Sequence, residues 1–184
     1  MTYKVLVLGD YGTGKTTLFN QFLNAAPGAE KKPSIKLELI EFTRVIEGKE
    51  YVISLYDIPG KELASDKRSK LYNNCLGALV LFDISRPDTF RHALFWIEEL
   101  INYSGTGKVP IVLVGNKTDI RESSQRTLNP IDAKEFIFRL NRTSLKDGVD
   151  NHFFEVSAKS TKLLLSVIDQ LLKSMIKHEE TRKK

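Results

Sequence analysis

Residues 3–22 read YKVLVLGDYGTGKTTLFNQF. An almost continuously apolar segment, typical of a buried strand, runs into a loop with spaced glycines and then into an amphipathic helical pattern that begins near Thr16. The loop matches G-x-x-x-x-G-K-[ST] from Gly9 to Thr16, with the strand before it and the helix after it that this motif requires. Glycines let the backbone turn its N–H groups inward, and the helix adds the positive end of its dipole. The stretch predicts a phosphate-binding loop rather than a glycine-rich turn with a solvated lysine.

The residues of this loop have separate expected roles. Lys15 can reach between the outer phosphates of a nucleotide, and the Thr16 hydroxyl suits Mg²⁺, a hard cation that prefers oxygen ligands. The phosphate chain is expected to lie on the backbone of Gly12, Thr13, Gly14, Lys15, Thr16 and Thr17. A dinucleotide-binding loop is disfavoured, because no third glycine follows at the spacing that G-x-G-x-x-G requires.

Strand and helix patterns alternate along the rest of the chain. Nearly continuous apolar segments, typical of parallel strands covered on both faces, occupy residues 3–9, 77–83, 109–116 and 152–157. Amphipathic helical patterns start at Thr16 and span residues 88–103, 129–140 and 163–176. Two alternating segments, 36–46 and 50–57, predict an antiparallel hairpin. We expect one α/β domain with a mostly parallel central sheet, one antiparallel hairpin strand and helices on both faces.

The helical patterns predict which side chains are buried. In residues 88–103 the expected inward face is Phe90, Leu94, Ile97 and Ile101. In residues 163–176 it is Leu164, Val167, Ile168, Leu171, Leu172 and Met175. Asn129 and Pro130 are expected to act as N-cap and first residue of their helix.

Composition narrows the function classes. The 184 residues fit one domain, and the net charge of +5 is spread along the chain without an arginine-rich tract, so nucleic acid is not an expected partner. The single cysteine, Cys75, lies in an apolar stretch and is expected to be a small buried residue. His92, His152 and His178 lack ligand spacing and are interpreted as structural or surface residues. With no signal peptide, membrane-length apolar run or lipidation motif, the expected location is cytoplasmic, without a direct lipid anchor.

A second motif indicates which base the nucleotide carries. Residues 116–119 read NKTD at the end of an apolar segment. The Asp119 carboxylate can accept from both N1–H and the exocyclic amine of guanine, whereas adenine lacks this pair of donors. Two charge-assisted hydrogen bonds of about 1.5–3 kcal/mol each give discrimination of roughly a hundred- to ten-thousand-fold. The Lys117 stem can lie along the base and Asn116 can steady the loop.

The last apolar segment is followed by a motif that completes the expected base site. Ser157, Ala158 and Lys159 come directly after it, and the Ala158 backbone N–H could meet the guanine carbonyl. The expected guanine-binding residues are Asn116, Lys117, Asp119, Ser157, Ala158 and Lys159.

Four motifs in this order, GDYGTGKT, DIPG, NKTD and SAK, resemble those of the Ras-like small GTPases across essentially the whole chain. The resemblance implies a single Ras-like domain, here residues 1–178, followed by a short basic tail, 179–184. It also implies binding of GTP or GDP with Mg²⁺. In this family the GTP-bound form holds two mobile segments that bind effectors and regulators, and hydrolysis releases them.

The resemblance places these two switch segments at about residues 27–37 and 58–72. Ser34 stands where the family has a threonine that ligates Mg²⁺ and contacts the γ-phosphate. Asp57 would hold Mg²⁺ through a water, and Gly60 would offer its N–H to the γ-phosphate. The aromatic residue that relatives often stack on the base is not evident, and Pro27 lies near its place.

Lys61 departs from the family pattern, because most relatives have a glutamine there. Its ammonium can neutralise phosphate charge but cannot accept a hydrogen bond from the attacking water. Tyr11 replaces a small residue and would crowd the place where an activating protein inserts an arginine. The residues implied to act on the γ-phosphate are Lys15, Ser34, Gly60 and Lys61, and hydrolysis is expected to be slow. A permanently GTP-bound interaction module is the alternative, and an ATP-binding protein is a distant third.

Two polar stretches have no assigned chemistry. The chain is longer than typical relatives by about a dozen residues before Ser157, around residues 141–150, where we expect a surface loop with a partner-specific insertion as the alternative. The charged run 61–70 is expected to be solvated, although its place in the second switch also makes it a candidate for partner binding.

Overall fold

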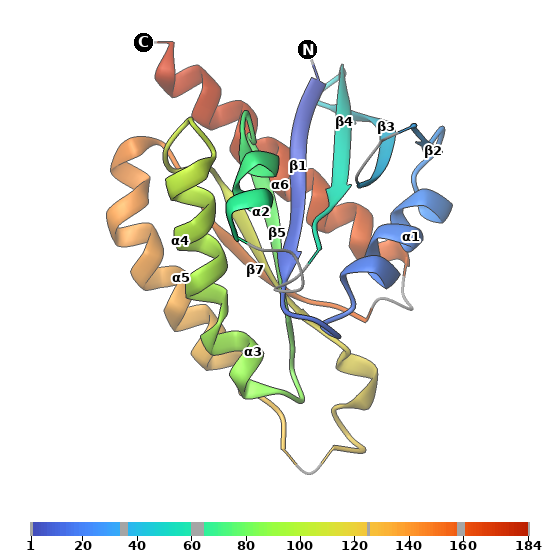
Figure 1. Cartoon of the computed structure of the whole chain (residues 1–184), viewed down its shortest axis with the longest axis vertical. Coiled ribbons are helices and arrows are strands. Elements are labelled where there is room, and N and C mark those ends of the chain that lie inside the picture. The colour runs from blue at the N-terminus through green and yellow to red at the C-terminus, as the bar shows by residue number, and fades with distance from the viewer. Residues whose placement is uncertain (1, 34–36, 60–64, 125, 158–160, 184) are drawn as a thin grey trace.

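The computed structural model describes residues 2–33, 37–59, 65–124, 126–157 and 161–183, which form one seven-stranded sheet with helices packed against it (Figure 1). Ser34, Gly60, Lys61, Ala158 and Lys159 lie outside these ranges. The strands are β1 (Thr2–Gly9), β2 (Glu30–Lys31), β3 (Glu38–Ile46), β4 (Lys49–Asp57), β5 (Gly77–Asp83), β6 (Ile111–Asn116) and β7 (His152–Glu155). The helices are α1 (Lys15–Ala25), α2 (Ser65–Tyr72), α3 (Pro87–Arg91), α4 (Ala93–Tyr103), α5 (Pro130–Ser144) and α6 (Thr161–Arg182), with short 3₁₀ turns η1 (Thr118–Ile120) and η2 (Leu145–Asp147).

The sheet has the order β2-β3-β4-β1-β5-β6-β7. Strands β4, β1, β5, β6 and β7 are parallel, and β3 pairs antiparallel with β4 and with the short edge strand β2. The predicted α/β class and the predicted hairpin are therefore confirmed. Because the parallel strands point the same way, the residues that follow β1, β4, β5 and β6 gather at one edge of the sheet.

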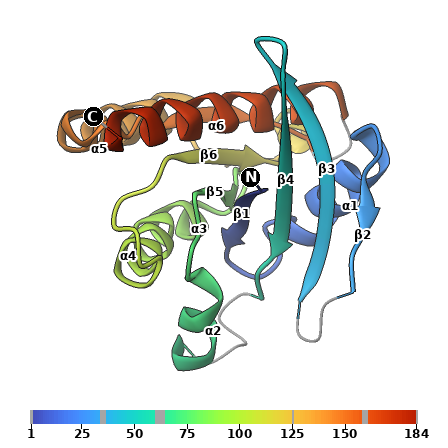
Figure 2. The ribbon, with the colours of Figure 1, turned by 90° about the horizontal axis from the view of Figure 1, so that it is seen from above.

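Both faces of the sheet are covered, which explains why the parallel strands are apolar on both sides. Val5 and Val7 of β1 join one buried cluster with residues of α1 and α6, whereas Leu6 and Leu8 join another with residues of α2, α4 and α5. Figure 2 shows α6 on one side of the sheet and α2 and α4 on the other. Cys75 is fully buried in the second cluster, as expected. Among the described helices none is long and apolar enough to cross a membrane.

The predicted helix over residues 88–103 is interrupted. The structure has α3 and α4, which meet at His92, and the inward residues of α4 include Ala93, Trp96, Ile97 and Leu100. Of the predicted face, Ile97 is buried and Phe90 and Ile101 are partly buried against the same core, whereas Leu94 is 51% exposed. Trp96, which is not part of the predicted face, is 1% exposed and belongs to the core.

The other two patterned helices match their predictions more closely. The Asn129 side chain accepts a hydrogen bond from the Ile131 N–H and caps α5, with Pro130 as the first helical residue. The six predicted residues on α6 are all buried: Leu164, Val167, Ile168, Leu171, Leu172 and Met175. Helix α6 continues to Arg182 and so crosses the predicted end of the domain at residue 178.

The expectation of a surface loop over residues 141–150 is partly wrong. Helix α5 continues to Ser144, and both Ser144 and Val149 are buried. The Asn151 amide donates to Asn141 Oδ1 and Ser144 Oγ at 2.9 Å each, while its Oδ1 accepts from the Ile111 N–H at 3.0 Å. The segment is tied to the start of β6 by these amide hydrogen bonds, which a polar composition alone does not distinguish from a solvated loop.

Candidate functional site

The sequence motifs meet at the edge of the sheet where the parallel strands end. Gly9 ends β1 beside Leu81 of β5, and Asp83 of β5 lies opposite Asn116 of β6. Asp57 ends β4, whose register with β1 places it opposite Val7. The predicted phosphate loop, the predicted Mg²⁺ carboxylate and the NKTD segment thus share one edge.

Three glycines of the phosphate loop have positive φ angles: +138° at Gly9, +76° at Gly12 and +94° at Gly14. An added Cβ would lie 2.3 Å from Leu81 O at Gly9 and 2.3 Å from Asn116 Nδ2 at Gly14. Gly14 is also the N-cap of α1 and provides no side-chain cap. The first turn of α1 therefore has no side-chain cap, and helix N-termini of this kind are suited to binding anions.

The Lys15 ammonium is held inside this loop. Lys15 is only 8% exposed, and its Nζ donates to Gly9 O at 2.8 Å and Asp10 O at 2.9 Å. The Thr13 hydroxyl also donates to Asp10 O at 2.8 Å. These bonds fix a positive charge at the mouth of α1, beside the uncapped amides.

Thr16 and Asp57 form the part of the predicted Mg²⁺ site that is described. Thr16 Oγ1 donates to Asp57 Oδ2 at 2.6 Å, and Asp57 Oδ1 is buried without a hydrogen-bond partner among the described residues. Burial raises the pKa of Asp57 despite the opposing effects of the Thr16 hydrogen bond and the Lys15 charge. A hydroxyl beside a carboxylate with an unsatisfied oxygen fits a hard cation. The described residues contain no cluster of three His, Cys, Asp or Glu side chains that could hold a metal.

A pocket of about 250 Å³ lies beside the loop and includes the predicted base-reading residues. Its lining is Gly14, Thr17, Asn116, Lys117, Asp119, Ile120 and Ser157. The Asp119 carboxylate is exposed to it and accepts a hydrogen bond from Ser157 Oγ at 2.9 Å. A carboxylate has several acceptor positions, and this bond orients the group.

Asn116 links this pocket to the phosphate loop. It is 1% exposed, and its Nδ2 donates to Thr13 O at 2.9 Å. The expectation that Asn116 steadies a loop therefore has a definite partner, the backbone of the phosphate loop itself.

Lys117 has a partner that the sequence motifs did not indicate. Its Nζ lies 2.6 Å from Asp83 Oδ2, and the Asp83 Oδ1 accepts from the Ser85 N–H and hydroxyl. Burial raises the pKa of Asp83, but the hydrogen bonds from Lys117 and Ser85 outweigh it and hold that pKa below its usual value. The sequence feature that could have indicated Asp83 as a site residue is its position at the end of a buried strand.

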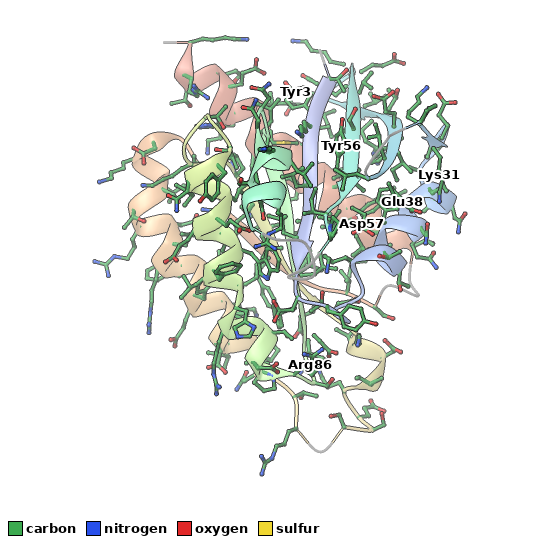
Figure 3. The ribbon with its side chains drawn as sticks, in the orientation of Figure 1. Tyr3, Lys31, Glu38, Tyr56, Asp57 and Arg86 are labelled. Carbon is green, nitrogen blue, oxygen red and sulfur yellow. The ribbon has the colours of Figure 1, made fainter. Side chains whose placement is uncertain are left out.

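Residues of the α3–α4 region also make hydrogen bonds to the phosphate loop. Asp10 Oδ1 accepts from the Trp96 indole N–H at 2.9 Å, and Asp10 Oδ2 is bonded to His92 Nδ1. Arg86 Nη1 donates to Tyr11 O at 3.1 Å, and Figure 3 shows Arg86 beyond the end of β5. His92 thus has a structural role at the site, and no sequence spacing indicated these contacts.

One charged residue of the second switch segment is buried, contrary to the expectation for residues 61–70. Arg68 of α2 is 3% exposed and donates through Nε and Nη2 to both carboxylate oxygens of Glu99 on α4, at 2.8 and 2.7 Å. The Tyr72 hydroxyl donates to the same carboxylate at 2.6 Å. The paired charges explain why an arginine is buried here.

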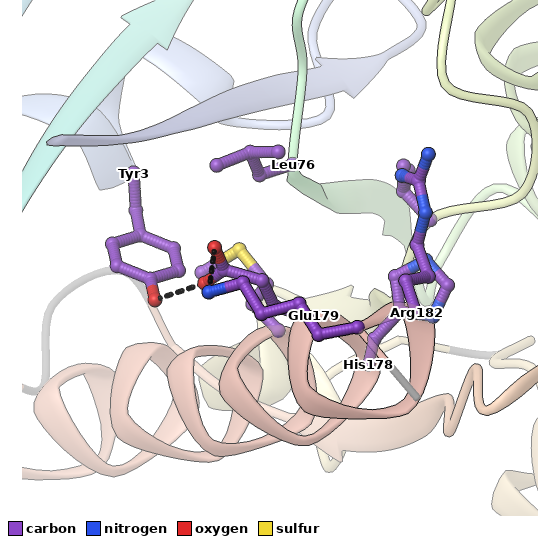
Figure 4. Close-up of a pocket in the computed structure, with 8 residues that line it drawn as sticks. Tyr3, Leu76, His178, Glu179 and Arg182 are labelled. Carbon is purple, nitrogen blue, oxygen red and sulfur yellow. Dashed lines mark hydrogen bonds and ion pairs between the residues drawn. The ribbon is translucent and has the colours of Figure 1, made fainter. Parts of the chain in front are cut away.

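A separate apolar pocket of about 290 Å³ lies at the opposite end of the strands (Figure 4). Tyr3, Leu76 and Val109 line it from the sheet side, with Met175 and the last turns of α6 opposite. The Tyr3 hydroxyl donates to Glu179 there at 2.8 Å. None of the described residues that line this pocket belongs to a motif.

Comparison with known proteins identifies relatives of the whole chain. The family model described as the Ras family matches residues 4–177. The chain is similar to Ras-related protein Rab11C of Nicotiana tabacum, with 34% identity over 162 residues that cover 88% of this chain and 68% of that protein. It is also similar to two Arabidopsis thaliana proteins. Ras-related protein RABA2a is 29% identical over 187 aligned residues, covering 97% of this chain and 81% of that protein. Ras-related protein RABA1a is 31% identical over 168 aligned residues, which cover 88% of this chain and 76% of that protein.

Proposed function

Since the chain belongs to the Ras family of GTP-binding small GTPases, we propose that it is a Mg²⁺-dependent switch that hydrolyses GTP slowly and binds effectors in its GTP state. The observation that supports this most is the Asn116–Thr13 hydrogen bond. It joins a loop suited to phosphates to a pocket suited to guanine, so that one ligand can engage both.

The proposed nucleotide contacts divide between phosphates and base. The backbone of residues 12–17, the Lys15 ammonium and, outside the described residues, Ser34 and Gly60 would hold the phosphates. The Asp119 carboxylate would accept the two guanine donors, and the Ala158 N–H would meet the guanine carbonyl. The remaining base-site residues, Asn116, Lys117, Ser157 and Lys159, would support these contacts.

Thr16, Ser34 and Asp57 would hold Mg²⁺. The buried Asp57 Oδ1, which has no hydrogen-bond partner within the part of the chain that the structure describes, supports this assignment together with the adjacent Thr16 hydroxyl. When bound, Mg²⁺ supplies positive charge against the phosphate oxygens. The chain's own contribution is to place the Lys15 ammonium and the amides of the phosphate loop around the same oxygens.

Slow hydrolysis is proposed from two departures at the site. Lys61 has only donors, so it cannot orient the attacking water by accepting its proton. Tyr11 is 78% exposed, which places a large ring on the surface that an activating protein would approach. A permanently GTP-bound interaction module remains the second candidate, because the same two departures would also suit a protein whose catalysis has been lost.

The proposed partners are effectors and regulators that contact residues of about 27–37 and 58–72. A protein of this kind would work in the cytoplasm or reach a membrane through its partners. Pull-down with protein loaded with GTP or with GDP tests the switching directly, because proposed effectors should bind the GTP form alone.

Single-turnover hydrolysis of bound GTP tests the catalytic proposal. We expect Lys61→Gln to hydrolyse GTP faster than the wild type, because the amide restores an acceptor for the water. Lys70→Gln, an exposed change on α2, is the matched control and should leave the rate unchanged. Measurable hydrolysis by the wild type at a rate at or above that of Lys61→Gln contradicts the proposal that Lys61 slows hydrolysis. Lack of turnover in both proteins would favour the permanently GTP-bound module.

A further inference from the structure

Arg86 lies outside the predicted motifs, yet it contacts the phosphate loop. Its backbone is fixed between β5 and α3: the Arg86 N–H donates to Asp83 O at 2.9 Å, and Arg86 O accepts from Thr89 Oγ1 at 2.7 Å. From there its side chain reaches back over the loop. Nη1 donates to Tyr11 O at 3.1 Å, while Nη2 lies 3.4 Å from Asp88 Oδ2.

The hydrogen bond to Tyr11 O sets the direction of the next N–H group. The described peptide bonds are all trans, and in a planar trans peptide the C=O and the following N–H point in opposite directions. An arginine that holds Tyr11 O on the α3 side therefore turns the Gly12 N–H away from α3. Gly12 itself has φ +76°, and an added Cβ would lie 3.3 Å from Arg86 Nη1, so the guanidinium packs closely against this peptide.

The Tyr11–Gly12 peptide depends on a contact from elsewhere in the chain, because the side chains of these two residues do little to hold its orientation. The Tyr11 ring is 78% exposed and Gly12 has no side chain. The preceding residue is anchored differently, through the bonds from Asp10 to His92 and Trp96. The segment from Arg86 to Trp96 thus holds two consecutive residues of the loop, one by its carboxylate and the next by its carbonyl.

We propose that Arg86 is a positioning residue of the nucleotide site, which aims the Gly12 N–H at the polyphosphate of the bound guanine nucleotide. This inference rests on the proposed function. Arg86 acts through the Tyr11–Gly12 peptide, so its loss should weaken binding of the phosphates while leaving the guanine contacts at Asp119 in place. A hydrogen bond to a charged group contributes enough that its misalignment should speed nucleotide release roughly ten-fold.

The test compares dissociation of a fluorescent GDP from wild type, Arg86→Met, Arg86→Lys and Arg91→Met. Methionine keeps an unbranched apolar stem and removes the guanidinium donors, whereas lysine keeps the positive charge and an N–H donor group. Arg91, an exposed arginine at the end of α3, is the control for lost charge. We expect roughly ten-fold faster release from Arg86→Met, with Arg86→Lys and Arg91→Met near wild type.

A second readout separates positioning from general stabilisation. The ¹⁵N–¹H resonance of Gly12 in the GDP-bound protein should shift in Arg86→Met and stay near its wild-type place in Arg91→Met. If Arg86→Met does not fold, Arg86→Gln is measured in its place. Equal release from Arg86→Met and wild type, or equally fast release from Arg91→Met, overturns the inference. A wild type that binds no guanine nucleotide instead overturns the proposed function.

Discussion

Gly14 lies where the phosphate loop passes closest to the NKTD segment. Its φ is +94°, and the added methyl group of Gly14→Ala would lie 2.3 Å from Asn116 Nδ2. We expect this substitution to break the Asn116–Thr13 bond and to weaken guanine-nucleotide binding by at least ten-fold, since a buried amide would lose its acceptor. Titration with a fluorescent GDP measures the effect.

Gly107→Ala is the matched control for this change. Gly107 has φ +75°, but no atom of the described residues lies within 4 Å of the position that an added Cβ would take. The Gly107→Ala protein should therefore lose only about 1 kcal/mol of unfolding free energy, because of backbone strain, and keep its nucleotide affinity. Equal affinities in the two variants would contradict the assigned role of the Asn116–Thr13 bond.

Cys75 makes stability depend on pH in the alkaline range. Burial raises the pKa of its thiol to about 12. The thiol donates a hydrogen bond from Sγ to Gly77 O at 3.1 Å. The unfolded chain loses this proton at about pH 8.5, so the folded state binds more protons above that pH. The contribution of Cys75 to the free energy of unfolding is fully present below about pH 8.5 and is lost as pH rises toward 12.

We therefore expect the free energy of unfolding to fall with pH above about 9, and to fall less steeply in Cys75→Ala. Urea unfolding at a series of pH values measures both slopes. The native thiol should also resist an exposed-thiol reagent at pH 8 until the protein unfolds. Rapid modification of the folded protein would show that the Cys75 site is open.

At the scale of secondary-structure elements, the Arg68–Glu99 ion pair ties α2 to α4. The guanidinium also lies 5.0 Å from the centroid of the Trp96 ring, so it is enclosed by an aromatic face as well as a carboxylate. Trp96 in turn donates to Asp10 of the phosphate loop. The end of the second switch segment and the phosphate loop thus share one support on α4.

Arg68→Met should destabilise the protein by about 3–5 kcal/mol, because it leaves the Glu99 carboxylate buried without its cation. The double variant Arg68→Met/Glu99→Leu should recover much of this loss, since both charges are then absent. Lys70→Met, an exposed change on the same helix, should have little effect. Urea denaturation compares the four proteins, and a single variant as stable as Lys70→Met would show that the pair is not effectively buried.

Individual elements show what the sequence could predict. The heptad-like burial on α6 and the Asn129 cap of α5 depend on local spacing, and both were confirmed. The inward position of Trp96 was missed, because its indole bonds to Asp10, which is 86 positions away along the chain. Arg68 was likewise expected to be exposed, because it lies in a run of charged residues. Its partner Glu99 belongs to another helix and could not be identified from that run.

At the scale of the whole molecule, the fold was predictable because parallel strands must be covered on both faces and must end at one edge. That edge brings together the motif residues that are described, from the phosphate loop to Asp119. The supports behind them were not predictable: Asp83 behind Lys117, and Arg86 and His92 behind the phosphate loop. They come from a segment whose residues match no motif, and only tertiary packing makes them neighbours of the site.

The central claim is that this edge selects a guanine nucleotide through the Asp119 carboxylate. Competition binding of GDP, ADP and xanthosine diphosphate to the wild type and to Asp119→Asn tests it most directly. The wild type should prefer GDP by a hundred-fold or more, and Asp119→Asn should shift toward xanthosine diphosphate, because its amide can donate to the carbonyl that replaces the guanine amine. An Asp119→Asn protein that keeps the full wild-type preference for GDP would contradict the account.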